Sequence, residues 1–196
     1  MTPAYQPLTQ HGHPLGEVAS AFQKAIRRGL EDEALHWGVE LDISNYGEYA
    51  WKRMRIITSE DIGLAELHLP AQIRALYDNW VDQRKKKDDK HGPERLFLIH
   101  GILLLVRSHK SRLVDHALIT YYGNHAKREI PDWALDKHTF RGRRLKRGVK
   151  HFFEEGIRLT NKMTLPLDEG YEANALDTMM RKEREGKTEE LFTDGE

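Results

Sequence analysis

The chain has 196 residues, of which 39% are hydrophobic and 32% are charged, and its formal net charge is zero. This composition is typical of amphipathic helices with solvated outer faces, and the absence of cysteine excludes disulfide bonds and thiolate metal sites. The N-terminal residues lack the basic and apolar regions of a signal peptide, and the longest apolar run, 102–106, is too short for a membrane span, so we expect a cytoplasmic protein without a membrane partner.

Apolar residues recur at helical spacing, and no segment alternates with a period of two, so we predict an all-α fold of six to eight helices in an array or bundle. Along the chain, Gly29 is predicted to end the first helix, and Asn45 with Glu48 to form the capping box of another. Gly63 is predicted to end that helix, and Pro70 to open the next.

The segment 94–108 is hydrophobic nearly all round, which predicts a central helix on which the others pack. Thr139 is predicted to cap a last long helix with an apolar seam through Val149 and Phe152. The predicted organisation is a flexible lead over 1–15, a helical domain over 16–165, and a helical extension with an acidic tail over 166–196. The predicted core comprises Phe22, Leu35, Trp37, Ile57, Ile73, Leu76, Trp80, Leu96, Ile99, Leu103 and Phe152.

The charge distribution is uneven although the net charge is zero. Residues 137–150 carry seven basic and no acidic residues, whereas residues 168–196 carry ten acidic and four basic ones. Several cations without a nearby carboxylate are suited to contact nucleic-acid phosphates, and the alternative is that they pair with the acidic tail of the same chain or of a neighbouring subunit. The candidate nucleic-acid-binding residues are Lys137, Arg141, Arg143, Arg144, Lys146, Arg147 and Lys150.

Two stretches resemble a known family. Residues 21–66 run from a helix with Lys24 and Arg27, through an acidic linker and an Ala-Leu-x-Trp element, to an arginine-rich helix that closes in Ser-Glu-Asp-Ile-Gly. Residues 107–118 are similar to a Pro-Lys-Ser-Asn segment between two helices. Together they resemble the C-terminal helical region of the replication-associated recombination protein A (MgsA) family of clamp-loader-like AAA+ ATPases. The residues that carry the motifs, with an expected structural role, are Trp37, Arg53, Ser59, Glu60, Asp61, Gly63, Lys110 and Ser111.

The resemblance implies a collar-like helical module that drives tetramerisation in proteins acting at stalled replication forks. Gly186-Lys187-Thr188 is not a P-loop, because position 181 is Arg where the motif needs Gly. We therefore expect a non-catalytic oligomerisation module without a cofactor, which forms a tetramer or dimer. Its further candidate partners are DNA and an AAA+ ATPase subunit.

An enzymatic alternative is a small metal-dependent phosphohydrolase built on Glu60, Asp61, Asp115 and His116. Against it, the acids of the Ser59–Asp61 segment are expected to bond backbone N–H groups of the next turn, or to pair with Arg53 or Arg55. Since no His-x-x-x-His pair occurs, no metal ligand is predicted.

Overall fold

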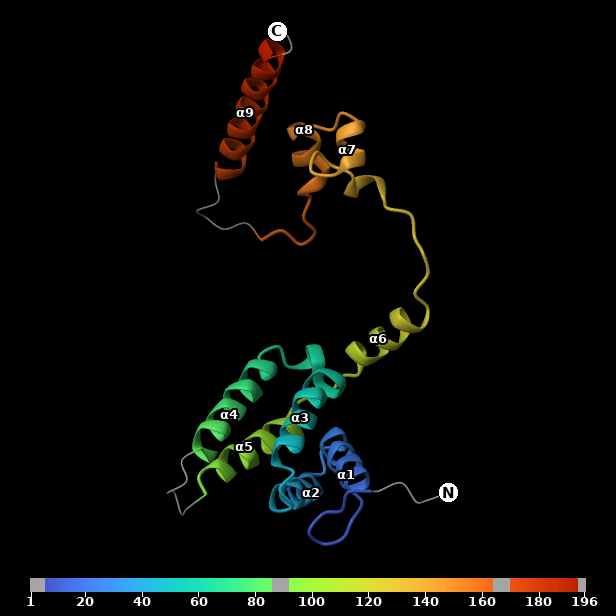
Figure 1. Cartoon of the computed structure of the whole chain (residues 1–196), viewed down its shortest axis with the longest axis vertical. Helices are drawn as coiled ribbons and strands as arrows, with labels where there is room; N and C mark the ends of the chain where they lie inside the picture. Colours follow the sequence, from blue (N-terminus) through green and yellow to red (C-terminus); the bar gives the residue numbers. More distant parts are fainter. Residues whose placement is uncertain (1–5, 86–91, 164–169, 194–196) are drawn as a thin grey trace. The chain divides into compact units, whose positions relative to one another are not determined.

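The computed structural model describes residues 6–85, 92–163 and 170–193, and this part of the chain is all-helical (Figure 1). It contains nine α-helices within those ranges, and its β-type pairing there is one isolated bridge between Leu8 and Pro14. The number exceeds the predicted six to eight because the expected last long helix is broken into short pieces. The chain divides into two compact units, 1–125 and 126–196.

The first unit is built from six α-helices in its described residues. A π-helical turn, η1, and a 3-10 turn, η2, follow the third helix directly. The elements are α1 (Leu15–Arg28), α2 (Glu31–Ile43), α3 (Gly47–Ile57), η1 (Thr58–Ile62), η2 (Gly63–Ala65), α4 (Leu69–Arg84), α5 (Glu94–Arg107) and α6 (Leu113–Gly123).

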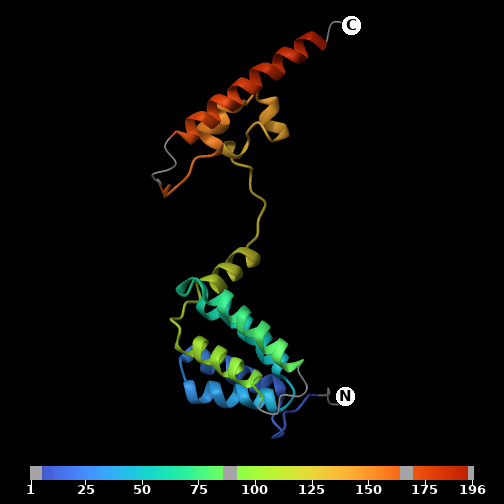
Figure 2. The ribbon, with the colours of Figure 1, turned by 90° about the vertical axis from the view of Figure 1, so that its left-hand side faces the viewer.

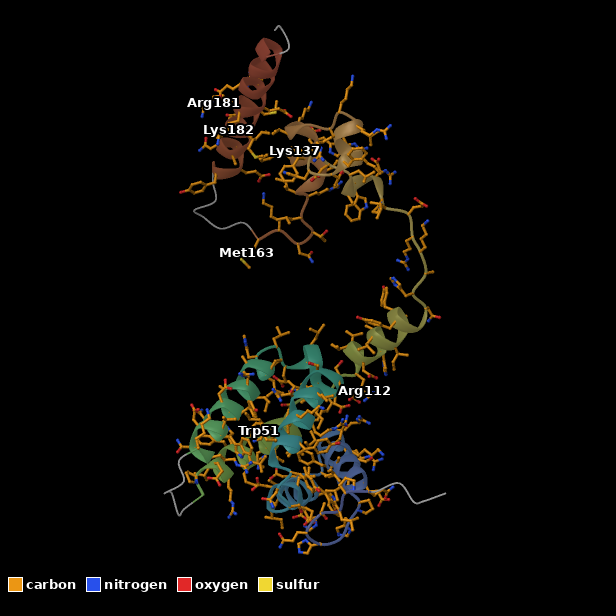
Figure 3. All side chains as sticks on the ribbon, in the orientation of Figure 1. Trp51, Arg112, Lys137, Met163, Arg181 and Lys182 are labelled. Carbon is orange, nitrogen blue, oxygen red and sulfur yellow. The ribbon has the colours of Figure 1, made fainter. Side chains whose placement is uncertain are left out.

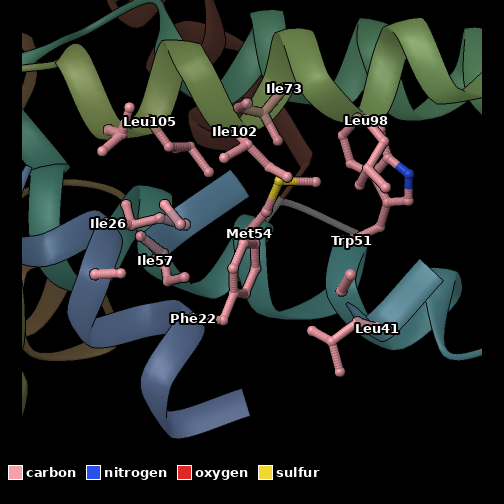
Figure 4. Packing of buried hydrophobic residues seen from close by; sticks show 14 of the residues in the cluster. Phe22, Ile26, Leu41, Trp51, Met54, Ile57, Ile73, Leu98, Ile102 and Leu105 are labelled. Carbon is pink, nitrogen blue, oxygen red and sulfur yellow. The ribbon is translucent and has the colours of Figure 1, made fainter. Parts of the chain in front are cut away.

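Helix α5 packs against α1, α2, α3 and α4, and thus has the central position predicted for it (Figures 1 and 2). Its buried side chains include Leu98, Ile102 and Leu105, which lie on one face at helical spacing and belong to the same buried cluster as Phe22 and Met54 (Figure 4). One face therefore makes the core contacts, although the sequence is apolar nearly all round.

The predicted core is correct at Phe22, Ile57, Ile73 and Trp80, which are buried in one cluster. The prediction that Leu96 is buried is wrong. Leu96 is 72% exposed, because the side of α5 that carries it faces away from the packed helices. Five other predicted residues are half-buried, namely Leu35, Trp37, Leu76, Ile99 and Leu103. Half-buried Phe152 belongs to the second unit and not to this cluster.

Trp51 was not predicted to be buried, yet it is one of the largest fully buried side chains. Its ring meets those of Tyr77 and Trp80 at centroid distances of 5.7 and 6.0 Å. Gly101 of α5 faces the Trp51 ring, and a Cβ there would lie 3.2 Å from it. The small residue in the central helix thus makes room for the largest side chain of α3.

Two helix ends agree with the sequence. Gly29 follows α1 with φ of 70°, and Gly63 follows η1 with φ of 51°, both in the left-handed region that favours glycine. The prediction that Asn45 and Glu48 form a capping box is wrong. Asn45 has φ of 65° and, with Tyr46, closes the preceding helix α2 through backbone bonds to Asp42 and Leu41.

Residues 6–14, which lie within the expected flexible lead, are held against α2. The Gln10 backbone N–H donates to Ser44 Oγ at 2.8 Å. The ring of His11 bonds the buried carboxylate of Glu40 with Nδ1 and Oε2 2.6 Å apart. A buried acid on α2 therefore fixes the segment that leads into α1.

The second unit contains η3 (Asp132–Ala134), α7 (Phe140–Arg144), α8 (Val149–His151), the π-helical turn η4 (Phe152–Gly156) and α9 (Tyr171–Thr193). Thr139 caps α7 as predicted, because its hydroxyl accepts from the Gly142 N–H at 3.0 Å. The predicted long helix is wrong. Lys146 has φ of 55° and Gly148 is extended, so the helix ends after one turn and restarts at Val149.

None of the helices in the described ranges combines the length and apolar character needed to cross a bilayer.

Candidate functional sites

The first four residues of the Ser-Glu-Asp-Ile-Gly motif lie in η1, the π-helical turn at the end of α3, and Gly63 begins η2. Such turns are rare and often occur at functional sites. Thr58 donates from Oγ1 to the Met54 carbonyl at 2.7 Å, which closes the turn before it. The left-handed Gly63 then redirects the chain, and a Cβ on it would lie 2.8 Å from Val114 of α6. The glycine is thus required both for its backbone and for close packing.

Asp61 is the centre of the motif and is fully buried. Its carboxylate accepts from Arg27 Nε at 2.6 Å and from Nη1 of Arg112, which is labelled in Figure 3, at 2.7 Å. Arg27 donates a second bond from Nη2 at 3.3 Å, and the Gln23 side-chain amide is a third donor group at 3.2 Å. A buried carboxylate is stable when guanidinium groups and hydrogen bonds compensate its charge, as they do here.

The prediction that Arg53 or Arg55 pairs with the acids of this motif is wrong. Arg53 donates to the side-chain oxygen of Gln23, and Arg55 lies over the Tyr77 ring at 4.6 Å. Partners of Asp61 come instead from α1 and from the loop before α6, 34 and 51 residues away in sequence. Nothing in local spacing identifies them.

The acids of the enzymatic alternative are partly brought together. Glu60 bonds Arg27 at 2.9 Å and Arg112 at 3.2 Å, and Asp115 bonds Arg112 as well. Within the described ranges, no group of three or more His, Asp or Glu side chains is placed to hold a metal ion. A divalent cation at these carboxylates would have to displace guanidinium groups that already neutralise them.

Lys110 and Ser111 of the second motif lie between α5 and α6. The Lys110 ammonium donates to the carbonyls of Leu105 at 2.8 Å and Val106 at 3.0 Å, at the negative end of α5. Burial lowers the pKa of Lys110, while nearby Asp61 and Glu66 act in the opposite direction. The Ser111 N–H donates to the Asp61 carbonyl at 2.9 Å, so Lys110 holds this loop to the end of α5 and Ser111 holds it to η1.

The other two motif residues are peripheral. Trp37 is half-buried and donates from Nε1 to Glu33 at 2.9 Å on the same helix. Ser59 is exposed and lines an open groove of about 550 Å³ between α3 and α6. The groove has an apolar base of Ile56, Val114 and Leu118 between charged side chains.

Helix α6 is the most unusual surface of the first unit, and sequence reasoning missed it. No residue of this apolar helix is buried, although η1 and η2 pack against one side of it. Isolated exposed apolar side chains are ordinary, but a contiguous group marks an interaction surface. The exposed large side chains are Leu113, Leu118, Ile119, Tyr121 and Tyr122.

The basic segment 137–150 does not lie on the one long helix that was predicted after Thr139, because α7 ends at Arg144 and α8 begins at Val149. Arg147 is turned inward. It donates to the carbonyls of Asp132 and Leu135 at 2.7 Å each, and to both carboxylate oxygens of Asp132 at 2.6 Å. Arg147 therefore closes the loop that begins at η3.

The remaining cations of this segment differ in their surroundings. Arg143 donates to the His138 carbonyl at 3.0 Å, and Lys150 lies 3.8 Å from Glu154. Lys137 (labelled in Figure 3) and Arg144 face the rings of Phe152 and Phe140. Arg141 and Lys146 are exposed, and neither has a partner among the described residues.

A side chain of the acidic C-terminal part does contact the basic segment, but it bonds the backbone of that segment and not its cations. Glu183 of α9 accepts from the Val149 N–H at 3.2 Å, at the start of α8. A carboxylate at the first turn of a helix stabilises the N–H groups that lack partners there. This contact leaves the exposed guanidinium and ammonium groups of Arg141 and Lys146 uncovered by α9's described side chains.

No protein-family model matches the chain, and no curated protein matches it. The resemblance to the MgsA family thus rests on the residues of segments 21–66 and 107–118.

Proposed function

We propose that this chain is a non-catalytic helical module that self-associates through α6 and serves DNA replication or recombination in the cytoplasm, beside an AAA+ ATPase subunit. The observation that supports self-association is the exposed apolar side chains of α6. The resemblance to the helical region that drives tetramerisation in the MgsA family favours a second copy of the chain as the occupant.

Exposed apolar area supplies the driving force for such an association, at about 25 cal/mol for each Å² removed from water. Ile119 and Tyr122 are 59% and 85% exposed, so both are free to enter a contact between copies. The charged groups around the neighbouring groove, including Lys52 and Asp115, would form the polar rim of that contact.

Light scattering of the purified chain tests this proposal. We expect a dimer or tetramer of the 22.9 kDa chain at micromolar concentration, and a monomer for the double variant Ile119→Glu with Tyr122→Glu. The matched control is Thr120→Glu on the same helix, which adds a charge without removing apolar area and should retain the oligomer. A monomeric wild-type chain, or an oligomer that survives the double substitution, would refute association through α6.

The nucleic-acid part of the proposal is supported by exposed Arg141 and Lys146 in the second unit. Neutralising two phosphate contacts should lower the salt dependence of binding, because each contact contributes a slope of about −0.9 in log K against log salt on duplex DNA. We expect Arg141→Gln with Lys146→Gln to reduce the slope by about two contacts. Arg158→Gln, an exposed cation outside the segment, is the control. Equal slopes in all three proteins would remove this segment from the proposal.

Metal analysis of the purified protein distinguishes the alternative function, a metal-dependent phosphohydrolase, from the proposed non-catalytic module. One tightly bound divalent ion per chain, lost on substitution of Asp115 by Asn, would favour the enzyme over the module.

A further inference from the structure

Apart from the apolar surface of α6, the first unit has a surface with uncompensated charge. A cavity of about 270 Å³ opens between α1, α3 and η1. Its lining includes the cations of Lys24, Arg27 and Arg53, whereas Glu60 is its one carboxylate among the described lining residues. The cavity is separate from the apolar groove of α6, since Glu60 alone is common to both linings.

Arg53 is the residue that makes this cavity unusual. Its guanidinium is half-buried, and within the described ranges its hydrogen-bond acceptor is the neutral amide of Gln23, with no carboxylate partner. The Nε atom is buried and has no acceptor among the residues that the structure describes. A half-buried guanidinium without a counterion is costly, and an anion in the adjoining cavity would relieve that cost.

The other donors converge on the same space. Lys24 is exposed and bonds Ser20 Oγ at 2.8 Å, which leaves two of its three N–H groups free. Arg27 donates from Nε to Asp61 and from Nη2 to Glu60. Its Nη1 forms no hydrogen bond with a described residue. Tyr49 also lines the cavity.

The balance of charge identifies the class of anion. The described lining of the cavity carries three cations, Lys24, Arg27 and Arg53, against one carboxylate, Glu60, and neither Lys24 nor Arg53 has an ion pair with a described residue. Two positive charges thus remain, which a phosphomonoester or inorganic phosphate matches because it carries close to two negative charges at pH 7. Arginine forks and a lysine ammonium are also the groups that proteins use for phosphate oxygens.

We propose that the cavity between α1, α3 and η1 binds a dianionic phosphate group, held by Lys24 and Arg53 with Arg27 at its side. The ligand is either free phosphate or the terminal phosphate of a larger molecule. The proposal is independent of self-association through α6.

Isothermal titration of the full-length chain with inorganic phosphate, at constant ionic strength, tests the site. We expect saturable binding that is weakened by about 10- to 100-fold in Arg53→Gln and in Lys24→Gln, as the loss of a charged hydrogen bond predicts. Arg28→Gln removes an equal charge from an exposed position of α1 and should bind like the wild type. Circular dichroism checks folding, and exposed Lys24 decides the outcome if the Arg53 variant does not fold.

A second titration distinguishes the sources of the phosphate group. A 5′-phosphorylated oligonucleotide is compared with the same oligonucleotide ending in a hydroxyl. A preference for the phosphorylated end that disappears in the Lys24 and Arg53 variants identifies a terminal phosphate, and phosphate binding without that preference identifies the free ion. The proposal is overturned if phosphate binds all variants equally, or if neither inorganic phosphate nor the phosphorylated end is bound.

Discussion

At the scale of single residues, Asp61 links the parts of the first unit that are most distant in sequence. Its carboxylate is fully buried and joins Arg27 of α1 to Arg112 before α6, and its backbone carbonyl accepts from Ser111. Removing one member of a buried charged pair costs more than the pair contributes, because the remaining charge stays in place without compensation.

We therefore expect Asp61→Asn to lower the free energy of unfolding by about 3–5 kcal/mol, although Asn has almost the same shape. Urea denaturation followed by circular dichroism measures it. Asp78→Asn is the control, because Asp78 forms an exposed pair with Arg74 that is worth about 0.5 kcal/mol or less. Similar losses in the two variants would show that the buried network does not stabilise the fold.

Glu40 makes the stability of the first unit depend on pH. Hydrogen bonds from Thr9 and His11 lower the pKa of this carboxyl from 4.5 to about 2. Since the pKa is lower in the folded chain than in the unfolded one, the ionised carboxylate stabilises the fold at neutral pH. That stabilisation is lost as the pH falls from about 4.5 to about 2.

Replacing Glu40 by Gln should lower the free energy of unfolding by about 1–3 kcal/mol at pH 7, the worth of hydrogen bonds to a charged group. The difference from the wild type should shrink as the pH approaches 2. Urea titrations at several pH values measure it, with exposed Glu17→Gln as the control. A difference that stays constant with pH would contradict the assignment.

At the scale of elements, the short helix α7 depends on one glycine. A Cβ on Gly142 would lie 1.7 Å from the backbone carbonyl oxygen of Asp136, which no side-chain movement relieves. Gly142→Ala should therefore destabilise the second unit by about 1–3 kcal/mol or more. Hydrogen exchange of residues 132–156 measures this locally. Gly123→Ala in α6, where a Cβ would meet nothing within 4 Å, should be neutral or slightly stabilising.

Local signals in the sequence were sufficient for several of these elements. Gly29, Gly63 and Thr139 end or cap helices as predicted, because a left-handed turn or a capping hydroxyl depends on the nearest residues alone. Asn45 was assigned to the wrong helix, since an asparagine suits the end of one helix and the start of the next equally well.

Features set by distant contacts were not predictable in the same way. The apolar pattern of 94–108 does not distinguish buried Leu98 from exposed Leu96. The partners of Asp61 are far away in sequence. The inward orientation of Arg147 depends on a break in the helix at Lys146, which the residue types there did not predict. The exposure of α6 likewise emerges from packing, because its sequence is as apolar as a buried helix.

At the scale of the whole molecule, the two units have separate sources of stability. Every residue of the buried hydrophobic cluster lies between Val18 and Val106, inside the first unit. The second unit contributes only Leu135 and Val149 to the buried hydrophobic residues that the structure describes. Because a unit with its own core unfolds cooperatively by itself, residues 1–125 should fold without the rest of the chain.

Production of residues 1–125 alone tests this expectation together with the role of α6. We expect a helical fragment with a single cooperative thermal transition, measured by circular dichroism, and the same self-association as the full chain by light scattering. Loss of the cooperative transition would show that the first unit depends on the second. If the fragment associates while the full chain is a monomer, then residues 126–196 prevent the contact, and the apolar face of α6 serves the chain itself instead of a second copy.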